Sequence, residues 1–100
     1  MNQALPPDTA GAAAAPPSAA DLDAALRQAL QPTRLEVIDE SAAHAGHSGA
    51  NGLGRGTHFR VRIASPRFEG RTRVAKHRLV YDALRFFIDQ GVHAIAVETL

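Results

Sequence analysis

Two kinds of hydrophobic spacing alternate along the chain. Between residues 22 and 30, apolar side chains recur at steps of three and four, which predicts an amphipathic helix that stops before Pro32. Ser18 and Asp21 have the spacing of a capping box at its start, with Asp in the place of Glu. Residues 35–39 alternate and are rich in β-forming side chains, which predicts a strand. The folded part therefore starts as a helix followed by a strand.

The second half of the chain repeats both spacings. Residues 58–63 alternate, with three apolar side chains on one face and two arginines on the other, as in a half-buried strand. Residues 74–88 place apolar side chains at helical steps, and this amphipathic helix is predicted to end at Gly91. Residues 92–99 alternate again and predict a third strand.

The order helix–strand–strand–helix–strand predicts an α+β domain, in which two helices cover one face of a three-stranded mixed sheet. The second and third strands flank a helix, so they should run parallel, whereas the first and second should run antiparallel. One hundred residues make one domain. Residues 1–20 are mostly Ala, Pro and Gly and predict a disordered tail, which leaves residues 21–100 for the domain.

This connectivity gathers histidines at one edge of the sheet. Parallel strands begin at the same end, and His58 begins the second strand as His93 begins the third. The first strand runs the other way, so the glycine-rich loop of residues 41–56, with His44 and His47, lies at that end too. We therefore expect four of the five histidines to lie close together.

The chain contains no cysteine, which limits what these histidines could do. It can form no disulfide and offers no thiolate to a metal or cluster. Neutral imidazole is a common metal ligand, so ligation by His93 and a loop histidine is one hypothesis. The alternative is that His93 is a solvated residue at a strand end and that His58 is hydrogen-bonded to the loop. His77 lies on the apolar stripe of the second helix, far from this edge, and is expected to help packing.

Positive charge gathers at the start of the second helix. The net charge of the whole chain is only +1, so nucleic-acid binding would need a local patch. Cations at a helix start oppose the helix dipole, which favours a bound anion such as a nucleic-acid phosphate or an acidic partner surface. The alternative is a solvated basic rim. The residues concerned are Arg71, Arg73, Lys76 and Arg78.

Other classes of function lack their signatures. No stretch approaches the roughly 18 apolar residues of a membrane span, and the start of the chain does not have the pattern of a signal peptide. There is no P-loop, dinucleotide-binding fingerprint or nucleophile elbow. We therefore expect a cytoplasmic protein that binds no membrane and is not an enzyme.

Four segments, taken together, resemble the BolA family in their order and spacing. They are LEVIDES followed by a loop histidine, THFRVRIASPRFEG, KHRLVYDAL and VHAIAV, and the resemblance covers about residues 22–100. The chain departs from the family pattern in its longer, glycine-rich loop and in having Lys76 where the family has Arg before the histidine.

The resemblance implies a fold, a partner and a cofactor. The fold would be αββαβ, similar to class II KH domains, and the partner a monothiol glutaredoxin. The two proteins would share a bridging 2Fe–2S cluster, to which the glutaredoxin brings a cysteine and a glutathione thiol. His93 and His44 would be the ligands from this chain, with His47 and His58 as alternatives to His44.

The resemblance also bears on the free protein and on nucleic acid. No cluster is expected in the isolated protein, which should be a monomer or a weak homodimer. Members of the family have also been described as DNA-binding transcriptional regulators, a function that the basic start of the second helix would serve here.

Overall fold

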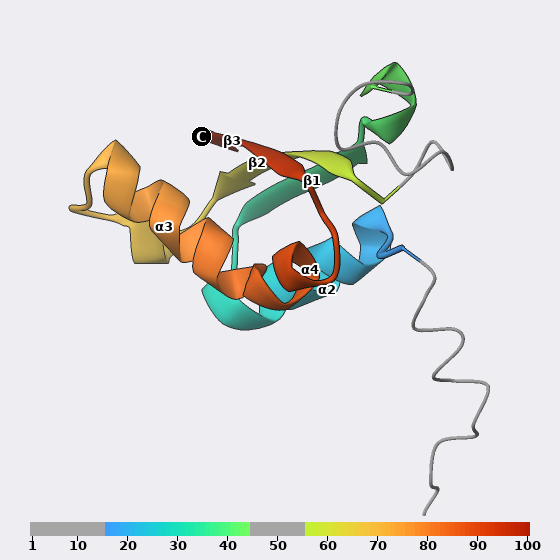
Figure 1. Ribbon diagram of the computed structural model, residues 1–100. Helices are drawn as coiled ribbons and strands as arrows, with labels where there is room; N and C mark the ends of the chain where they lie inside the picture. The colour runs from blue at the N-terminus through green and yellow to red at the C-terminus, as the bar shows by residue number, and fades with distance from the viewer. Residues whose placement is uncertain (1–15, 45–55) are drawn as a thin grey trace, which may run out of the picture.

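The computed structural model describes residues 16–44 and 56–100 (Figure 1). Within these residues no helix has the length and apolar character needed to cross a lipid bilayer. The elements, in chain order, are α2 (Ala19–Leu30), β1 (Arg34–Asp39), η1 (Ser41–His44), β2 (His58–Ala64), η2 (Pro66–Phe68), α3 (Arg73–Ala83), α4 (Arg85–Asp89) and β3 (Ala94–Thr99).

The three strands form one mixed sheet in the order β1–β2–β3. β1 pairs antiparallel with β2, and β2 pairs parallel with β3, as the sequence predicts. The helices α2, α3 and α4 lie on one side of the sheet (Figure 1). The predicted α+β class, with helices covering one face of a three-stranded mixed sheet, is therefore confirmed.

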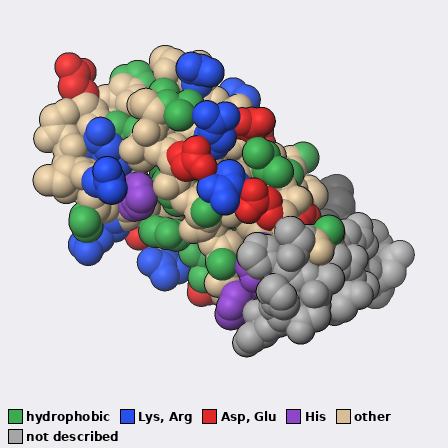
Figure 2. All heavy atoms as spheres, turned by 90° about the horizontal axis from the view of Figure 1, so that it is seen from above, with side chains coloured by type: hydrophobic (Ala, Val, Ile, Leu, Met, Phe, Trp, Pro, Cys, Tyr) green, Lys and Arg blue, Asp and Glu red, His purple; other side chains and the backbone are tan. Residues whose placement is uncertain are grey.

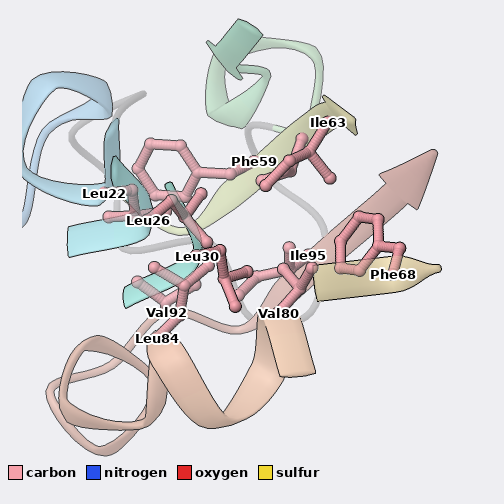
Figure 3. Close-up of a cluster of buried hydrophobic side chains, with 11 residues drawn as sticks. Leu22, Leu26, Leu30, Phe59, Ile63, Phe68, Val80, Leu84, Val92 and Ile95 are labelled. Atoms are coloured by element: carbon pink, nitrogen blue, oxygen red, sulfur yellow. The ribbon is translucent and has the colours of Figure 1, made fainter. Parts of the chain in front are cut away.

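The core lies between the helices and the inner face of the sheet. The alternation in β2 turns Phe59, Val61 and Ile63 inward, where each is at most 2% exposed. Leu22 and Leu26 of α2 are fully buried, because their spacing places them on one helix face. Figure 3 shows these side chains meeting others from the far end of the chain. The remaining members of the cluster are Leu30, Phe68, Val80, Leu84, Val92 and Ile95.

The first helix starts two residues before residue 21, where the sequence predicts that the domain begins: α2 begins at Ala19. The cause is the capping box, in which the Asp21 N–H donates to the Ser18 hydroxyl and the Ser18 N–H donates to the Asp21 carboxylate. Residues 1–15 lie outside the described residues.

The second predicted helix is also corrected, because it divides at Leu84. The Leu84 N–H donates to the carbonyls of Val80 and Tyr81, both at 3.1 Å, which closes α3 with a tight turn. The bend keeps Phe87 and Ile88 packed against the core and turns the chain back toward the sheet. β3 then begins at Ala94, two residues later than the sequence predicts.

The outer face of the sheet carries a chain of ion pairs that joins all three strands. Glu98 of β3 accepts hydrogen bonds from Arg60 at 2.6 Å and from Arg62 at 3.1 Å, both on β2. Arg62 also donates to Glu36 of β1 at 3.1 Å, and Arg60 donates to Glu40 at 2.8 Å. The network therefore supports the strand register on the face opposite the core.

These pairs shift the ionisation of Glu98. The hydrogen bond from Arg60, aided by the one from Arg62, lowers the pKa of the Glu98 carboxyl below its ordinary value of 4.5. The Glu98 and Arg60 side chains are 42% and 36% exposed, so salt should screen the attraction.

Replacing Glu98 with Gln should lower stability at neutral pH and cease to matter in acid. Because the folded pKa is lowered, the carboxylate's contribution to the free energy of unfolding is complete above the ordinary pKa of 4.5 and is lost as the pH falls below it. Urea unfolding midpoints of the two proteins should therefore differ at about pH 7 and converge toward about pH 3.

Glu69→Gln is the matched control, because Glu69 is exposed and forms no ion pair with any described residue. Its urea midpoint should stay close to that of the wild-type protein. A Glu98→Gln deficit that persisted in acid would contradict an ionic role for Glu98.

Candidate functional site

Two histidine rings meet where β2 and β3 begin. His58 is the first residue of β2 and is 7% exposed, whereas His93 immediately precedes β3 and is exposed. Their ring centroids lie 5.3 Å apart, with the planes inclined at 53°. The connectivity predicts this meeting, because parallel strands begin at the same end of a sheet. We call this end, with η1 at the close of β1, the histidine edge.

Thr57 contacts both histidines from one position. Its hydroxyl lies 2.9 Å from Nδ1 of His58. Its carbonyl oxygen accepts the N–H of His93 at 2.7 Å and that of Ala94 at 3.1 Å. Thr57 therefore fixes one ring through its side chain and the start of β3 through its backbone.

Ser41 ties the first residue of η1 to the same place. Its hydroxyl oxygen accepts the N–H of Thr57 at 2.9 Å and the N–H of His58 at 3.0 Å, and the hydroxyl faces the His58 carbonyl at 3.5 Å. Ser41 is only 1% exposed, so these backbone groups have little access to water. A buried hydroxyl that satisfies two buried N–H groups is costly to remove.

Asp39, the last residue of β1, binds both ends of the segment that connects β1 to β2. One carboxylate oxygen accepts the N–H of Ser41 at 2.8 Å, and the second accepts the N–H of Gly56 at 3.0 Å. Gly56 has a φ of +80° and packs against Pro16 and Pro17, which precede α2. The ends of the long connection are therefore held together by a carboxylate, a hydroxyl and a glycine in the left-handed region.

The other predicted ligands lie in or near the segment between the two strands. The backbone of His44 closes η1, three residues after Ser41, but its side chain lies outside what the structure describes. His47 falls outside the described residues altogether. Of the candidate pairs, the described structure brings His58 and His93 together.

A hollow of about 180 Å³ opens beside His93, and its lining includes Val92, Ile95 and Tyr81. The Tyr81 hydroxyl donates to the Ile95 carbonyl at 3.0 Å, which holds α3 against β3. Tyr81 and Ile88 also line a groove of about 510 Å³ along α3 and α4, to which His77 belongs. His77 is half-buried and lines this groove but not the hollow beside His93.

The predicted basic patch lies at the other end of β2, where α3 starts. Thr72 caps α3 by accepting the N–H of Ala75 at 3.1 Å. Arg71, Arg73 and Arg78 are exposed and Lys76 is half-buried. Across residues 16–44 and 56–100, none of these four is ion-paired with a carboxylate. Figure 2 shows Lys and Arg side chains spread over the visible described surface, with Asp and Glu side chains among them.

The donor set of the histidine edge limits its chemistry. Two imidazole nitrogens are suitable ligands for iron, zinc or copper, but a chain without cysteine cannot complete a thiolate site by itself. The sequence reasoning found both histidines and missed Ser41 and Thr57, which hold them. Ser41 ends the segment LEVIDES, and Thr57 begins the segment THFRVRIASPRFEG. A single small polar residue at a strand end does not belong to the hydrophobic periodicity, so the pattern could not indicate its role.

Comparison with known proteins gives consistent results. The family described as BolA-like protein matches residues 26–100. BolA-like protein 1 of Mus musculus is 44% identical over 90 residues, which cover 90% of this chain and 62% of the mouse protein. The chain thus spans under two thirds of that relative.

Solved structures agree with the sequence matches. The structure of BolA1 from Arabidopsis thaliana superposes with a TM-score of 0.71 at 40% identity, covering 83% of this chain and 89% of the other. The BolA domain of SufE1 from the same plant gives a TM-score of 0.71 at 37% identity, covering 81% of this chain and 87% of that domain.

Replacing Gly56 with Ala should destabilise the protein more than the same change at Gly70. Both glycines have a positive φ, +80° and +75°, where a Cβ costs about 1–2 kcal/mol. A Cβ at Gly70 would meet nothing within 4 Å, whereas one at Gly56 would overlap the Pro16 ring. Gly56→Ala should therefore cost about 1–3 kcal/mol more, the usual penalty of overpacking.

Urea unfolding of the two variants measures this difference directly. Equal losses of stability at the two positions would mean that Pro16 does not pack on the histidine edge as described.

Proposed function

The chain belongs to the BolA-like family, and from this premise we propose that it is a cytoplasmic adaptor that binds a monothiol glutaredoxin and shares a bridging 2Fe–2S cluster with it. The partner supplies a cysteine and a glutathione thiol, and this chain supplies two imidazoles. The adaptor serves iron–sulfur cluster trafficking or iron regulation.

The observation that carries the proposal is the contact between His58 and His93 in a chain without cysteine. Two imidazoles on one iron, with thiolates on the other, form a recognised cluster environment, and imidazole ligation raises the reduction potential. Such a site needs thiols from outside this chain, which makes a thiol-bearing partner part of the chemistry.

His93 is the first ligand in this proposal, since it is exposed and lies at the start of β3. For the second ligand, the family resemblance implies His44, while the described geometry favours His58. The side chain of His58 already lies against His93, and its Nδ1 lies 2.9 Å from the Thr57 hydroxyl. His47 remains the third candidate.

Mixing this protein with a cluster-loaded monothiol glutaredoxin should change the visible absorption and circular dichroism of the cluster. His93→Ala should abolish the change, because no other described histidine can take its place at the start of β3. His58→Ala and His44→Ala should then identify the second ligand: the variant that also abolishes the spectral change lacks that ligand. His77→Ala is the matched control and should behave as wild type, because His77 lies in the groove along α3.

Titration by size-exclusion chromatography in parallel should show a one-to-one complex. A cluster spectrum that stays the same with the wild-type protein, or that changes equally with His93→Ala, would contradict the proposal.

A second candidate function, nucleic-acid binding, is favoured by the four cations at the start of α3. They lie at the opposite end of β2 from the histidine edge and have no ion-pair partner within the described residues. Phosphate groups are the natural counter-charge for such a patch. The two functions use different surfaces, so one protein can carry both.

Double-stranded DNA affinity should fall steeply as salt rises, and Arg71→Ala with Arg73→Ala should make that fall shallower. Each lost phosphate contact reduces the slope of log K against log salt by about 1, so the double variant should lose about 2. Arg27→Ala with Arg85→Ala is the matched control, because those arginines are paired with Asp23 and Asp82. Fluorescence anisotropy that detects no binding at low salt, or equal slopes for all three proteins, removes this candidate.

A further inference from the structure

A hollow of about 350 Å³ lies where α2 packs against α3, and no residue of the histidine edge lines it. Its volume is near the lower end of the range for small-molecule sites. Apolar side chains from both helices form one part of the lining, and two arginines form another. They include Ala29 and Leu30 of α2, Leu79 and Ala83 of α3, and Arg67 and Arg71 from the segment between β2 and α3. We call this site the α2–α3 hollow.

The two arginines are held by uncharged hydrogen-bond acceptors. The Nε–H of Arg67 donates to Oε1 of Gln31 at 2.8 Å, and the Nε–H of Arg71 donates to the Arg67 carbonyl at 2.8 Å. The Gln31 amide is itself fixed, because its Nε2 donates to the carbonyl of Gln28. These hydrogen bonds use only the Nε–H of each guanidinium, so the N–H donors on its two terminal nitrogens stay available for a ligand.

The positive charge at this hollow lacks a counter-charge. Within residues 16–44 and 56–100, neither Arg67 nor Arg71 is ion-paired with a carboxylate. Guanidinium groups bind carboxylates and phosphates through parallel N–H donors. Asp82 also lines the hollow and accepts a hydrogen bond from Arg85 at 3.5 Å. Its negative charge repels a doubly charged ligand more than a singly charged one, which favours a carboxylate over a phosphate.

We propose that the α2–α3 hollow binds a small organic acid: the carboxylate lies against Arg67 and Arg71, and the aliphatic chain packs on the apolar side chains of the two helices. This binding goes beyond the proposed adaptor function and does not involve the histidines. It shares only Arg71 with the candidate nucleic-acid surface.

Arg67 also has a simpler role to be weighed against this one. It lies beside Gln31, the C-cap of α2, where a cation is favourable for the helix dipole. That role needs the charge of Arg67 but neither Arg71 nor the apolar lining. A ligand that combines a carboxylate with an aliphatic chain therefore separates the two roles.

Hexanoate is the probe, added to the full chain labelled with ¹⁵N at low salt and about pH 7. It should bind saturably and shift the backbone amide signals of the residues that line the hollow. Acetate and 1-hexanol should each bind at least about 10-fold more weakly. Acetate lacks most of the apolar chain, and 1-hexanol lacks the charged group, whose hydrogen bonds to arginine are worth about tenfold or more.

Arg67→Gln with Arg71→Gln should weaken hexanoate binding by at least about 10-fold and leave 1-hexanol binding unchanged. Arg27→Gln with Arg34→Gln is the matched control. It removes the same amount of charge from two exposed arginines that do not line the hollow, so hexanoate should bind as it does to the wild-type protein.

Ala29→Leu tests the apolar part of the site without a change of charge. Ala29 is exposed on α2 and lines the hollow, so a leucine there should fill it and weaken hexanoate binding by about 10-fold or more. The salt dependence of DNA binding should remain that of the wild-type protein, because all the phosphate-binding cations are still present.

Four results would overturn the inference. The first is the absence of saturable hexanoate binding. The second is acetate or inorganic phosphate binding as tightly as hexanoate, which would leave only an attraction between charges. The third is 1-hexanol binding as tightly, which would leave only apolar contact. The fourth is hexanoate binding that survives both the double arginine variant and Ala29→Leu. None of these results depends on glutaredoxin, so the adaptor function stands or falls separately.

Discussion

Hydrogen bonds from two buried hydroxyl residues, Ser41 and Thr57, hold the three strand ends together at the histidine edge. Ser41 follows β1, Thr57 precedes β2, and the Thr57 carbonyl receives the first N–H groups of the β3 segment. At this end of the sheet the apolar core gives way to polar groups, so packing alone cannot fix the backbone. Buried N–H groups must find acceptors, and that requirement sets the geometry of the edge.

The side chains on the two faces of the sheet fix the register of the strands. The inner face of β2 is held by Phe59, Val61 and Ile63, and the outer face by the ion pairs of Arg60 and Arg62. A slip of one residue would move the apolar side chains outward and the arginines into the core. The same register places His58 opposite Ala94, and therefore beside His93. The position of the candidate site is thus a consequence of the core and of the charge network together.

The helices, the strands and the meeting of two histidines could be predicted from the sequence. The bend in the second helix and the hydrogen bonds at the histidine edge could not. The spacing of Leu22, Leu26 and Leu30, and the alternation in β2, predict the elements because burial imposes those periods. Strand connectivity alone brings His58 and His93 to one edge. The bend at Leu84 was missed because no Gly or Pro marks it, and tertiary packing decides it. The roles of Ser41 and Thr57 were missed because they depend on contacts between residues 16 positions apart.

The central claim is that the histidine edge supplies imidazole ligands to a cluster held with a thiol-bearing partner. Pulsed electron paramagnetic resonance of the reduced, cluster-loaded complex tests it most directly, with only this protein's histidines labelled with ¹⁵N. Hyperfine couplings from two ¹⁵N nuclei that ligate the cluster, one of them lost in His93→Ala, are the predicted result. A spectrum without ¹⁵N couplings of ligand strength would show that the cluster, if bound, does not use these histidines, and would contradict the account.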